Sequence, residues 1–271
     1  GVYVMIEQVD KAYLERNFGS GEGNLYKASF GFDTMWQGPN PELYQDIGAE
    51  KKTNEEENDW SDIVELLDIL NNTPDDEFPD EIEGILNVDG FLSYLAANAV
   101  LSNMDSLVGD SCNFYLYNNP STGLFELIPW DLNGAFGNHN VSHESGNGLT
   151  ADEMIALDIE EPVTQGEEHL LIERVLAVDD YMDAYLDKVA DLVAGEFSPT
   201  QMNASFDDMH GVIEEAVYAD KYKEFSDEAF ASSLTTDLPD SDDPGRVLGL
   251  KPFVADRNAA IADQLDESLE R

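Results

Sequence analysis

Three side chains with oxygen atoms, Asp105, Asn113 and Asp131, stand where the chain changes from one structural element to the next. Asp105 follows a long apolar helical pattern, Asn113 opens the run NFYLYN, and Asp131 closes the run LFELIPW. The turn residues NPSTG join these two runs and predict a β-hairpin, whose strands are neighbours. Two carboxylates and an amide at one end of a hairpin are suited to bind a hard divalent cation through oxygen ligands.

Each of these residues also has an ordinary structural interpretation. Aspartates at such positions cap turns, and an asparagine at a strand end satisfies backbone groups. The order Asp, Asn, hairpin, Asp is nevertheless the order in which protein kinases supply a catalytic carboxylate, a metal-binding amide and a metal-binding aspartate. Asp105 and Asn113 are eight residues apart, further than in a kinase catalytic loop. Asp110, three residues before Asn113, competes with Asp105 for the role of base.

Lys27 lies in the middle of the predicted strand NLYKASF, in a chain with only 13 basic residues. Such a lysine either has a specific anionic partner or extends from an edge strand into solvent. The preceding turn, GSGEG, could cradle phosphates through backbone N–H groups, but a plain connection is the simpler interpretation. His139 and His143 fall in a polar loop after Asp131 and are interpreted as solvated, with a role in an activation segment as the alternative. Cys112 is interpreted as a buried, small apolar residue.

Several separated motifs resemble one known family. The segments GVYVMIEQVDKAYLERNFG, GNLYK, FLSYLAANAVLSNMDS, NFYLY and IPWDLNGAFG are similar to the spore-coat protein H (CotH) kinase family, atypical protein kinases with a two-lobed, kinase-like fold. The resemblance continues in LLIERVL and LKPFVADRNAAIADQL, so it covers most of the chain. The expected fold class is therefore α+β, with a truncated N-lobe and a mostly helical C-lobe that carries one β-hairpin.

The resemblance implies a role for each candidate residue. Lys27 would contact the nucleotide phosphates with Glu7 as its ion-pair partner. Asp105 would be the catalytic base, and Asn113 and Asp131 would be Mg²⁺ ligands. These groups suffice for phosphoryl transfer, which needs positioning and charge neutralisation rather than covalent help.

The implied activity is Mg²⁺-dependent transfer of the γ-phosphoryl group of ATP to Ser or Thr hydroxyls of proteins, autophosphorylation included, with Mn²⁺ as a second metal. Asn133 stands where the family pattern PWDLD has a second acid, which removes one charge. The alternative function is a kinase-like scaffold of weak catalytic power that acts as an adhesin-like binding protein of a surface or envelope. A third is an acidic metal-binding domain that binds no nucleotide. The family resemblance implies an extracellular, cell-envelope or spore-surface location.

The predicted organisation has three parts. Residues 1–36 are the remainder of a mixed α/β N-lobe, residues 37–58 an acidic polar loop, and residues 59–271 a helical C-lobe with the metal and catalytic site. The opening residues 2–9 predict a strand, and because they follow no initiator Met, part of the natural chain is expected before them. Helices are predicted over 10–18, 60–70, 88–104, 167–194, 199–218, 223–232 and 247–270.

Composition limits the possible partners of this 271-residue chain. There are 58 acidic residues against 13 basic ones, a formal charge of −45, so nucleic acid is not an expected partner. Acidity spread along the whole chain predicts adaptation to high salt, with a moderately saline habitat as the alternative. The single cysteine excludes an internal disulfide, and no apolar run is long enough to span a membrane.

The charge leads to a prediction about salt. Thermal unfolding should move to higher temperature as KCl rises, because screening shortens the Debye length from about 30 Å at 0.01 M to about 3 Å at 1 M. The divalent ion is held fixed and saturating, since a bound metal also stabilises the native state. A melting temperature that stays flat or falls toward molar KCl would contradict the high-salt adaptation.

Overall fold

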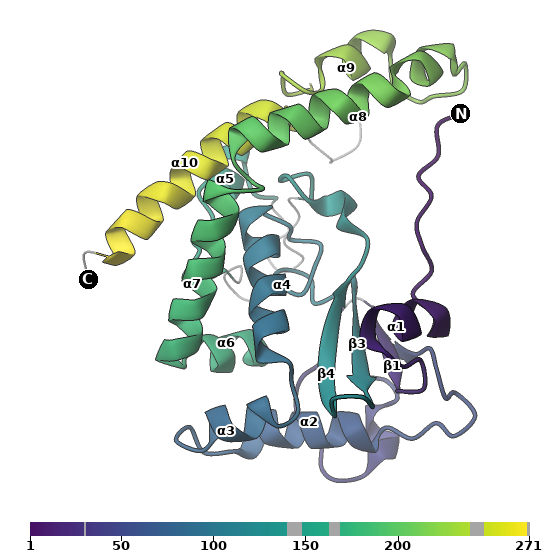
Figure 1. Ribbon diagram of the computed structural model, residues 1–271, viewed down its shortest axis with the longest axis vertical. Helices are drawn as coiled ribbons and strands as arrows, with labels where there is room; N and C mark the ends of the chain where they lie inside the picture. The colour runs from purple at the N-terminus through teal and green to yellow at the C-terminus, as the bar shows by residue number, and fades with distance from the viewer. Residues whose placement is uncertain (30, 140–147, 163–168, 239–246, 270–271) are drawn as a thin grey trace.

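The chain folds around one antiparallel sheet, as seen in the computed structural model (Figure 1), which describes residues 1–29, 31–139, 148–162, 169–238 and 247–269. The strands are β1 (Leu25–Ala28), β2 (Ala49–Lys51), β3 (Phe114–Asn119) and β4 (Leu124–Pro129), in the order β2-β1-β3-β4. The α-helices are α1 (Lys11–Phe18), α2 (Ser61–Asn72), α3 (Phe78–Glu83), α4 (Val88–Val100), α5 (Ala151–Ile155), α6 (Leu170–Leu176), α7 (Asp179–Ala194), α8 (Pro199–Ala219), α9 (Asp227–Ser232) and α10 (Leu250–Leu269). Two short 3-10 helices are η1 (Pro41–Tyr44) and η2 (Leu132–Gly134). Helices and sheet together confirm the predicted α+β class.

The sheet joins parts of the chain that the sequence separates. The predicted hairpin forms from β3 and β4. Strand β1 pairs with β3 along one edge and with β2 along the other. Lys27 on β1 lies opposite Tyr115 on β3 and Glu50 on β2, so β1 is a direct neighbour of a strand almost 90 residues further along the chain. Strand β2 is missing from the prediction, which has only a polar loop over residues 37–58. Its three residues are too few, and two of them too charged, to give a strand pattern.

The larger core lies between one face of the sheet and the helices α2, α4, α6 and α7 (Figure 1). Helix α2 buries the apolar face that the sequence predicts: Ile63, Leu66, Leu67 and Leu70. Helix α4 is apolar nearly all round, because it contacts β4 on one side and α7 on the other. Its last turn therefore ends inside the protein, directly before the loop that carries Asp105.

Helix α1 packs on the opposite face of the sheet. Asp10 caps this helix, since its Oδ1 accepts hydrogen bonds from the N–H groups of Ala12 and Tyr13 at 3.0 and 3.1 Å. Leu14 is fully buried there, in a second and smaller apolar cluster. Along the strands, the residues of this cluster alternate with residues that face the larger core. The sheet residues of the smaller cluster are Leu25, Tyr115, Tyr117 and Ile128.

The glycine-rich turn after α1 is packed against backbone. A Cβ on Gly23 would lie 1.9 Å from the carbonyl oxygen of Asn118, and one on Gly21 would lie 2.5 Å from that of Lys11. Both glycines are buried. Of the two interpretations of this turn, the structure favours a plain connection between elements. Its glycines permit a close approach of backbone to backbone.

The predicted strand over residues 2–9 is wrong. No strand includes these residues, and five apolar side chains in a row are exposed: Val2, Tyr3, Val4, Met5 and Ile6. Valine, isoleucine and tyrosine favour strands only where a partner strand supplies hydrogen bonds and packing, and the described residues place none beside this segment. The segment instead runs from α8 to α1 (Figure 1).

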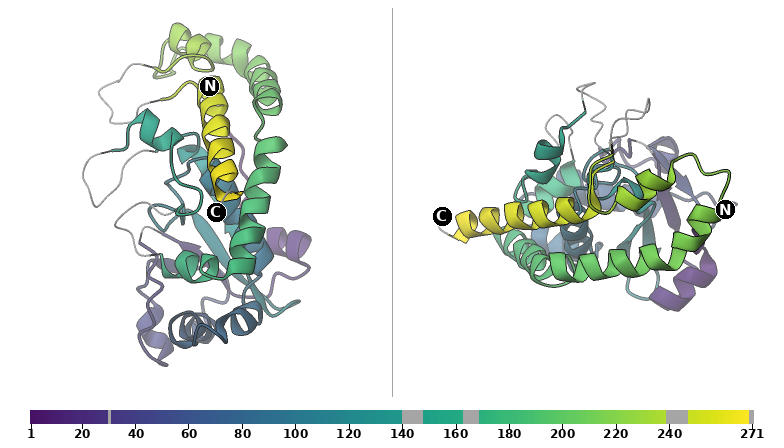
Figure 2. Two further views of the ribbon diagram at one scale, coloured as in Figure 1. Left: turned by 90° about the vertical axis from the view of Figure 1, so that its left-hand side faces the viewer. Right: turned by 90° about the horizontal axis from the view of Figure 1, so that it is seen from above.

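The helices after residue 167 follow the prediction in outline. The predicted helix 167–194 is broken into α6 and α7 at Ala177 and Val178, and residues 223–226 lie outside α9. Helices α8 and α10 lie together at the end of the molecule opposite α2 and α3 (Figures 1 and 2). Buried Arg257 of α10 donates to the carbonyl of Ala99, which ties α10 to the end of α4. No described helix is both long enough and apolar enough to cross a membrane.

The two glycine environments give a paired stability prediction. Gly23→Ala should lower the free energy of unfolding by at least about 2 kcal/mol, because overpacking a tight site costs about 1–3 kcal/mol and here the obstacle is backbone. Gly211→Ala is the matched control: Gly211 is exposed inside α8 with no atom near its Cβ position, so the change should stabilise by about 0.5–1 kcal/mol. Urea unfolding measures both, and an unaffected Gly23→Ala protein would contradict this packing.

Candidate functional site

Three of the candidate residues come from the loop between α4 and β3 and from the end of the hairpin. The side-chain amide of Asn113 donates to the main-chain oxygen of Asp105 at 3.2 Å. The N–H of Trp130 donates to the carbonyl of Asn113 at 3.1 Å, which extends the pairing of β3 and β4 by one step. Asp131 follows Trp130 directly, so all three residues belong to the same end of the hairpin.

The backbone at this end is held in an unusual conformation. Asn113 and Asp131 have φ angles of 55° and 50°, in the left-handed region that residues other than glycine seldom adopt. Among the described residues, seven other than glycine have positive φ, and five of them lie in or beside this loop and hairpin end: Ser102, Ser111, Asn113, Asp131 and Phe136. Such backbone strain concentrates at functional sites, where it fixes the direction of a side chain.

Neither aspartate acts as a cap. Asp131 stands at the N-cap position of η2 but its side chain accepts no capping hydrogen bond, and it is exposed. The carboxylate of Asp105 is bound by a side chain, the thiol of Cys112, at 3.3 Å. Asn113 does satisfy a backbone group, as the ordinary interpretation predicts, but this uses its Nδ2 and leaves its Oδ1 for another partner.

Burial raises the pKa of the Cys112 thiol, and the charge of Asp105, followed by those of Asp110 and Asp131, raises it further. The sulfur therefore keeps its proton at neutral pH and can donate it toward Asp105 Oδ1. Cys112 is buried, as the sequence predicts, but it has a polar contact as well.

Lys27 lies on the sheet face that also carries Tyr115 and Trp130. Its Nζ is 5.4 Å from the centre of the Trp130 ring and 5.9 Å from that of Tyr115, within cation–π distance of both. Trp130 is the residue before Asp131, so the lysine reaches toward the end of the hairpin. In the described part of the chain, no carboxylate lies within ion-pair distance of Lys27.

The ion pair between Lys27 and Glu7 is not formed. Both carboxylate oxygens of Glu7 accept from Arg16 Nη2 at 2.7 Å instead, on an exposed surface beside α1. The reason is the N-terminal segment, which does not enter the sheet and so leaves Glu7 away from β1. The acidic residue opposite Lys27 is Glu50 on β2, whose pKa is lowered first by Lys52 and also by Lys27.

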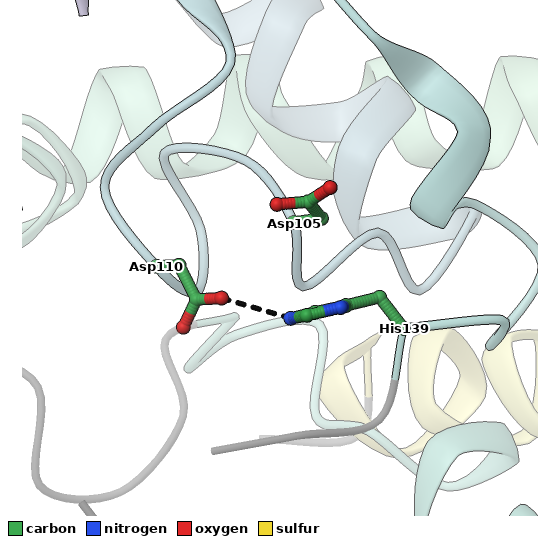
Figure 3. A group of neighbouring side chains, drawn as sticks. All are labelled: Asp105, Asp110 and His139. Carbon is green, nitrogen blue, oxygen red and sulfur yellow. Dashed lines mark hydrogen bonds and ion pairs between the residues drawn. The ribbon is translucent and has the colours of Figure 1, made fainter. Parts of the chain in front are cut away.

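The residue that sequence reasoning missed is His139. Its Nε2 is hydrogen-bonded to Asp110 Oδ2 at 2.8 Å, and Asp105 lies across from this pair (Figure 3). One ligand atom from each of Asp105, Asp110 and His139 lies within 4.8 Å of the others. The sequence has no local signal for this group, because His139 and Asp110 are 29 residues apart. His143, the other histidine of that loop, lies outside the described residues.

The group is held together by close packing around Gly134. A Cβ on this glycine would lie 2.6 Å from the Cβ of Asp105 and 3.1 Å from that of His139. Glycine is therefore required between the two for η2 to lie against Asp105. Asn133, beside it, is exposed, and its main-chain oxygen accepts from Asn138 Nδ2 at 3.0 Å.

An antiparallel sheet whose hairpin end carries two aspartates and an amide, with a lysine beside the tryptophan of that end, defines an α+β protein with candidate sites for a cation and an anion. The chain belongs to the CotH kinase protein family, whose family model matches residues 1–257. It is 32% identical over 141 residues to the inner spore coat protein H of Bacillus subtilis (strain 168). That alignment covers 51% of this chain and 38% of the relative, so the match spans less than half of the relative's length.

The His139–Asp110 contact predicts a pH-dependent stability. The hydrogen bond that His139 donates to Asp110 raises the pKa of His139 above the ordinary value of about 6.5, so the protonated form is favoured in the folded state. The stabilisation is fully present below the unfolded pKa and is lost as pH rises through the folded pKa. A double-mutant cycle with His139→Gln and Asp110→Asn, at fixed KCl, should give a larger coupling at about pH 5.5 than at about pH 9. Equal couplings at the two pH values would contradict the charged contact.

Proposed function

We propose that this protein is a metal-dependent protein kinase that transfers the γ-phosphoryl group of ATP to Ser or Thr hydroxyls of proteins. The observation that carries the proposal is the meeting of Asp105, Asn113 and the Asp131 segment at one strained hairpin end, in a member of the CotH kinase family. Phosphoryl transfer requires positioned charges rather than a covalent intermediate, and this end of the sheet supplies both signs of charge. That the chain adopts the two-lobed fold of a kinase is part of the same proposal.

The donor set fits Mg²⁺ or Mn²⁺. Asn113 has its Nδ2 committed to Asp105, which orients Oδ1 away from that contact, and the Asp131 carboxylate is exposed with no capping bond. Hard oxygen ligands of this kind suit Mg²⁺, which keeps several waters and shares its coordination with nucleotide phosphates. When bound, the ion neutralises phosphate charge. In a chain of formal charge −45 such neutralisation is essential for an anionic nucleotide to approach.

Asp105 is the better of the two candidate bases. Its side chain is partly exposed, and Cys112 fixes it through one oxygen, so the other oxygen can face an acceptor hydroxyl. Asp110 is 8% exposed and already holds His139. A general base must reach the proton that it accepts, which favours the accessible carboxylate.

Lys27 is proposed to bind the phosphates. It is held by two aromatic rings without a carboxylate within ion-pair distance among the described residues, so a phosphate would not have to displace a salt bridge. It lies next to Trp130, the residue that precedes the proposed metal ligand Asp131 in the sequence. Glu50 would take the orienting role that Glu7 does not have.

One observation favours a second function, a kinase-like scaffold with weak catalysis that binds partners at a surface or envelope. Within the described ranges the lysine has no buried ion-pair partner, because Glu7 pairs with Arg16 and Glu50 is exposed. Such a lysine is less firmly positioned than that of an active kinase. The relative's name supports a spore-coat location for either function.

Asp131→Ala should abolish Mg²⁺-dependent ATP binding and leave the fold intact, because this side chain is exposed and makes no cap. The unfolding temperature in the absence of nucleotide should fall only slightly, since alanine tolerates a φ of 50° less well than aspartate. Calorimetric titration with ATP, with and without Mg²⁺, measures the effect in molar KCl. Asp76→Ala is the matched control, since Asp76 is an equally exposed loop aspartate far from the hairpin end. An unchanged affinity in Asp131→Ala would favour the scaffold function.

A second variant, Asp105→Asn, separates ATP binding from phosphate transfer. ATP affinity should persist, while the rate of phosphate transfer to protein falls by about 10²–10⁴, the usual contribution of a general base. Phosphorylation is followed with radiolabelled ATP on the protein itself and on a mixture of Ser- and Thr-containing proteins. Transfer at an undiminished rate would remove Asp105 from the mechanism.

A further inference from the structure

The side chains of Asp105, Asp110 and His139 converge from two segments of the chain (Figure 3). Asp105 and Asp110 come from the loop after α4, and His139 follows η2. The residues are half-buried or buried: Asp110 is 8% exposed, and the side chain of His139 is 27% exposed. Two carboxylates and an imidazole that converge in a partly desolvated place are a possible ligand set for a divalent cation.

A second observation comes from Asn103, which is fully buried. Its Nδ2 donates to Asn98, but its Oδ1 has no hydrogen-bond partner among the described residues. This oxygen lies 3.1 Å from the Cβ position of Gly134, the same point that Asp105 and His139 adjoin. A buried acceptor without a partner is costly. A water bound to a cation at the group could donate to this oxygen.

We propose that Asp105, Asp110 and His139 form a second metal site, selective for a borderline cation such as Zn²⁺ over Mg²⁺. The imidazole nitrogen determines this selectivity, since Zn²⁺ and Co²⁺ bind nitrogen readily whereas Mg²⁺ prefers oxygen and retains its waters. The cation takes the place of the proton between His139 Nε2 and Asp110 Oδ2. Two carboxylates balance its charge, which suits a partly buried place.

The site is distinct from the one proposed at Asn113 and Asp131, yet Asp105 connects the two. Its main-chain oxygen accepts from Asn113, whereas its carboxylate faces His139 and Asp110. A carboxylate that is bound to a cation cannot accept a proton. If the proposed function holds, occupancy of the second site therefore inhibits phosphate transfer without displacing ATP.

Cobalt titration tests the site directly. Co²⁺ is added to the full chain in molar KCl with excess Mg²⁺, which occupies all-oxygen sites on an acidic surface. One Co²⁺ per chain should give the visible absorption of a nitrogen-ligated ion with few ligands, and Zn²⁺ should displace it. His139→Gln should weaken the affinity by more than about tenfold, since loss of even an outer-shell partner costs that much.

Two control variants locate the ion. Asp131→Asn should bind Co²⁺ as the unsubstituted protein does, and so should His210→Gln, because His210 lies on α8, away from the group, with its ring stacked on Phe230 of α9. Circular dichroism checks the fold of each variant. If His139→Gln does not fold, imidazole NMR of the unsubstituted protein replaces it: substoichiometric Co²⁺ should shift or broaden the His139 signals and not those of His210. A spectrum that His139→Gln leaves unchanged, or the spectrum of aqueous cobalt alone, would overturn the proposal.

Kinase assays then test the inhibition separately. Zn²⁺ should reduce kcat for phosphate transfer at saturating MgATP and leave ATP affinity unchanged. If no phosphate transfer is detectable but the cobalt site is present, the proposed function fails and the metal site stands. If transfer occurs and Co²⁺ does not bind, the metal site fails alone.

Discussion

The loop from Ser102 to Asp110 is the constraint on which the rest of the site depends. Ser102, Asn103 and Val108 are fully buried although the loop has no regular structure, so its polar groups must be satisfied within the protein. The N–H of Asp110 returns to the carbonyl of Met104 at 3.0 Å, and a Cβ on Gly109 would lie 2.1 Å from that same carbonyl oxygen. This closed loop holds Asp105 and Asp110 on one side of the hairpin end and leaves little freedom for either carboxylate.

Local patterns in the sequence were enough to predict the elements that carry this loop. The apolar spacing of α2 and α4, the NPSTG turn of the hairpin and Asp10 as a cap are short-range signals, and each is present in the structure. Strand β2 and the segment 2–9 were predicted wrongly for the same reason. Strand formation depends on which partner lies alongside, and β2 has β1 as a partner whereas residues 2–9 have none among the described residues.

The candidate site could be predicted only in part. Asp105, Asn113 and Asp131 are near the ends of predicted elements, and the hairpin register brings those ends together. The approach of His139 to Asp110 depends on the path of the chain after η2 and on the space that Gly134 leaves, which no spacing in the sequence reveals. The partner of Glu7 could not be predicted for a similar reason. The family resemblance suggested a pair with Lys27, but the path of the N-terminal segment brings Glu7 to Arg16.

The central claim is that the hairpin end binds a metal–nucleotide complex. Anomalous diffraction at the manganese edge tests it most directly, using crystals of this chain grown in molar KCl with Mn²⁺ and a non-hydrolysable ATP analogue. We expect a manganese peak between Asn113 Oδ1 and the Asp131 carboxylate, with the phosphates of the analogue extending toward Lys27. A nucleotide bound elsewhere on the protein, or manganese at this position with no nucleotide in the crystal at a saturating concentration of the analogue, would contradict it.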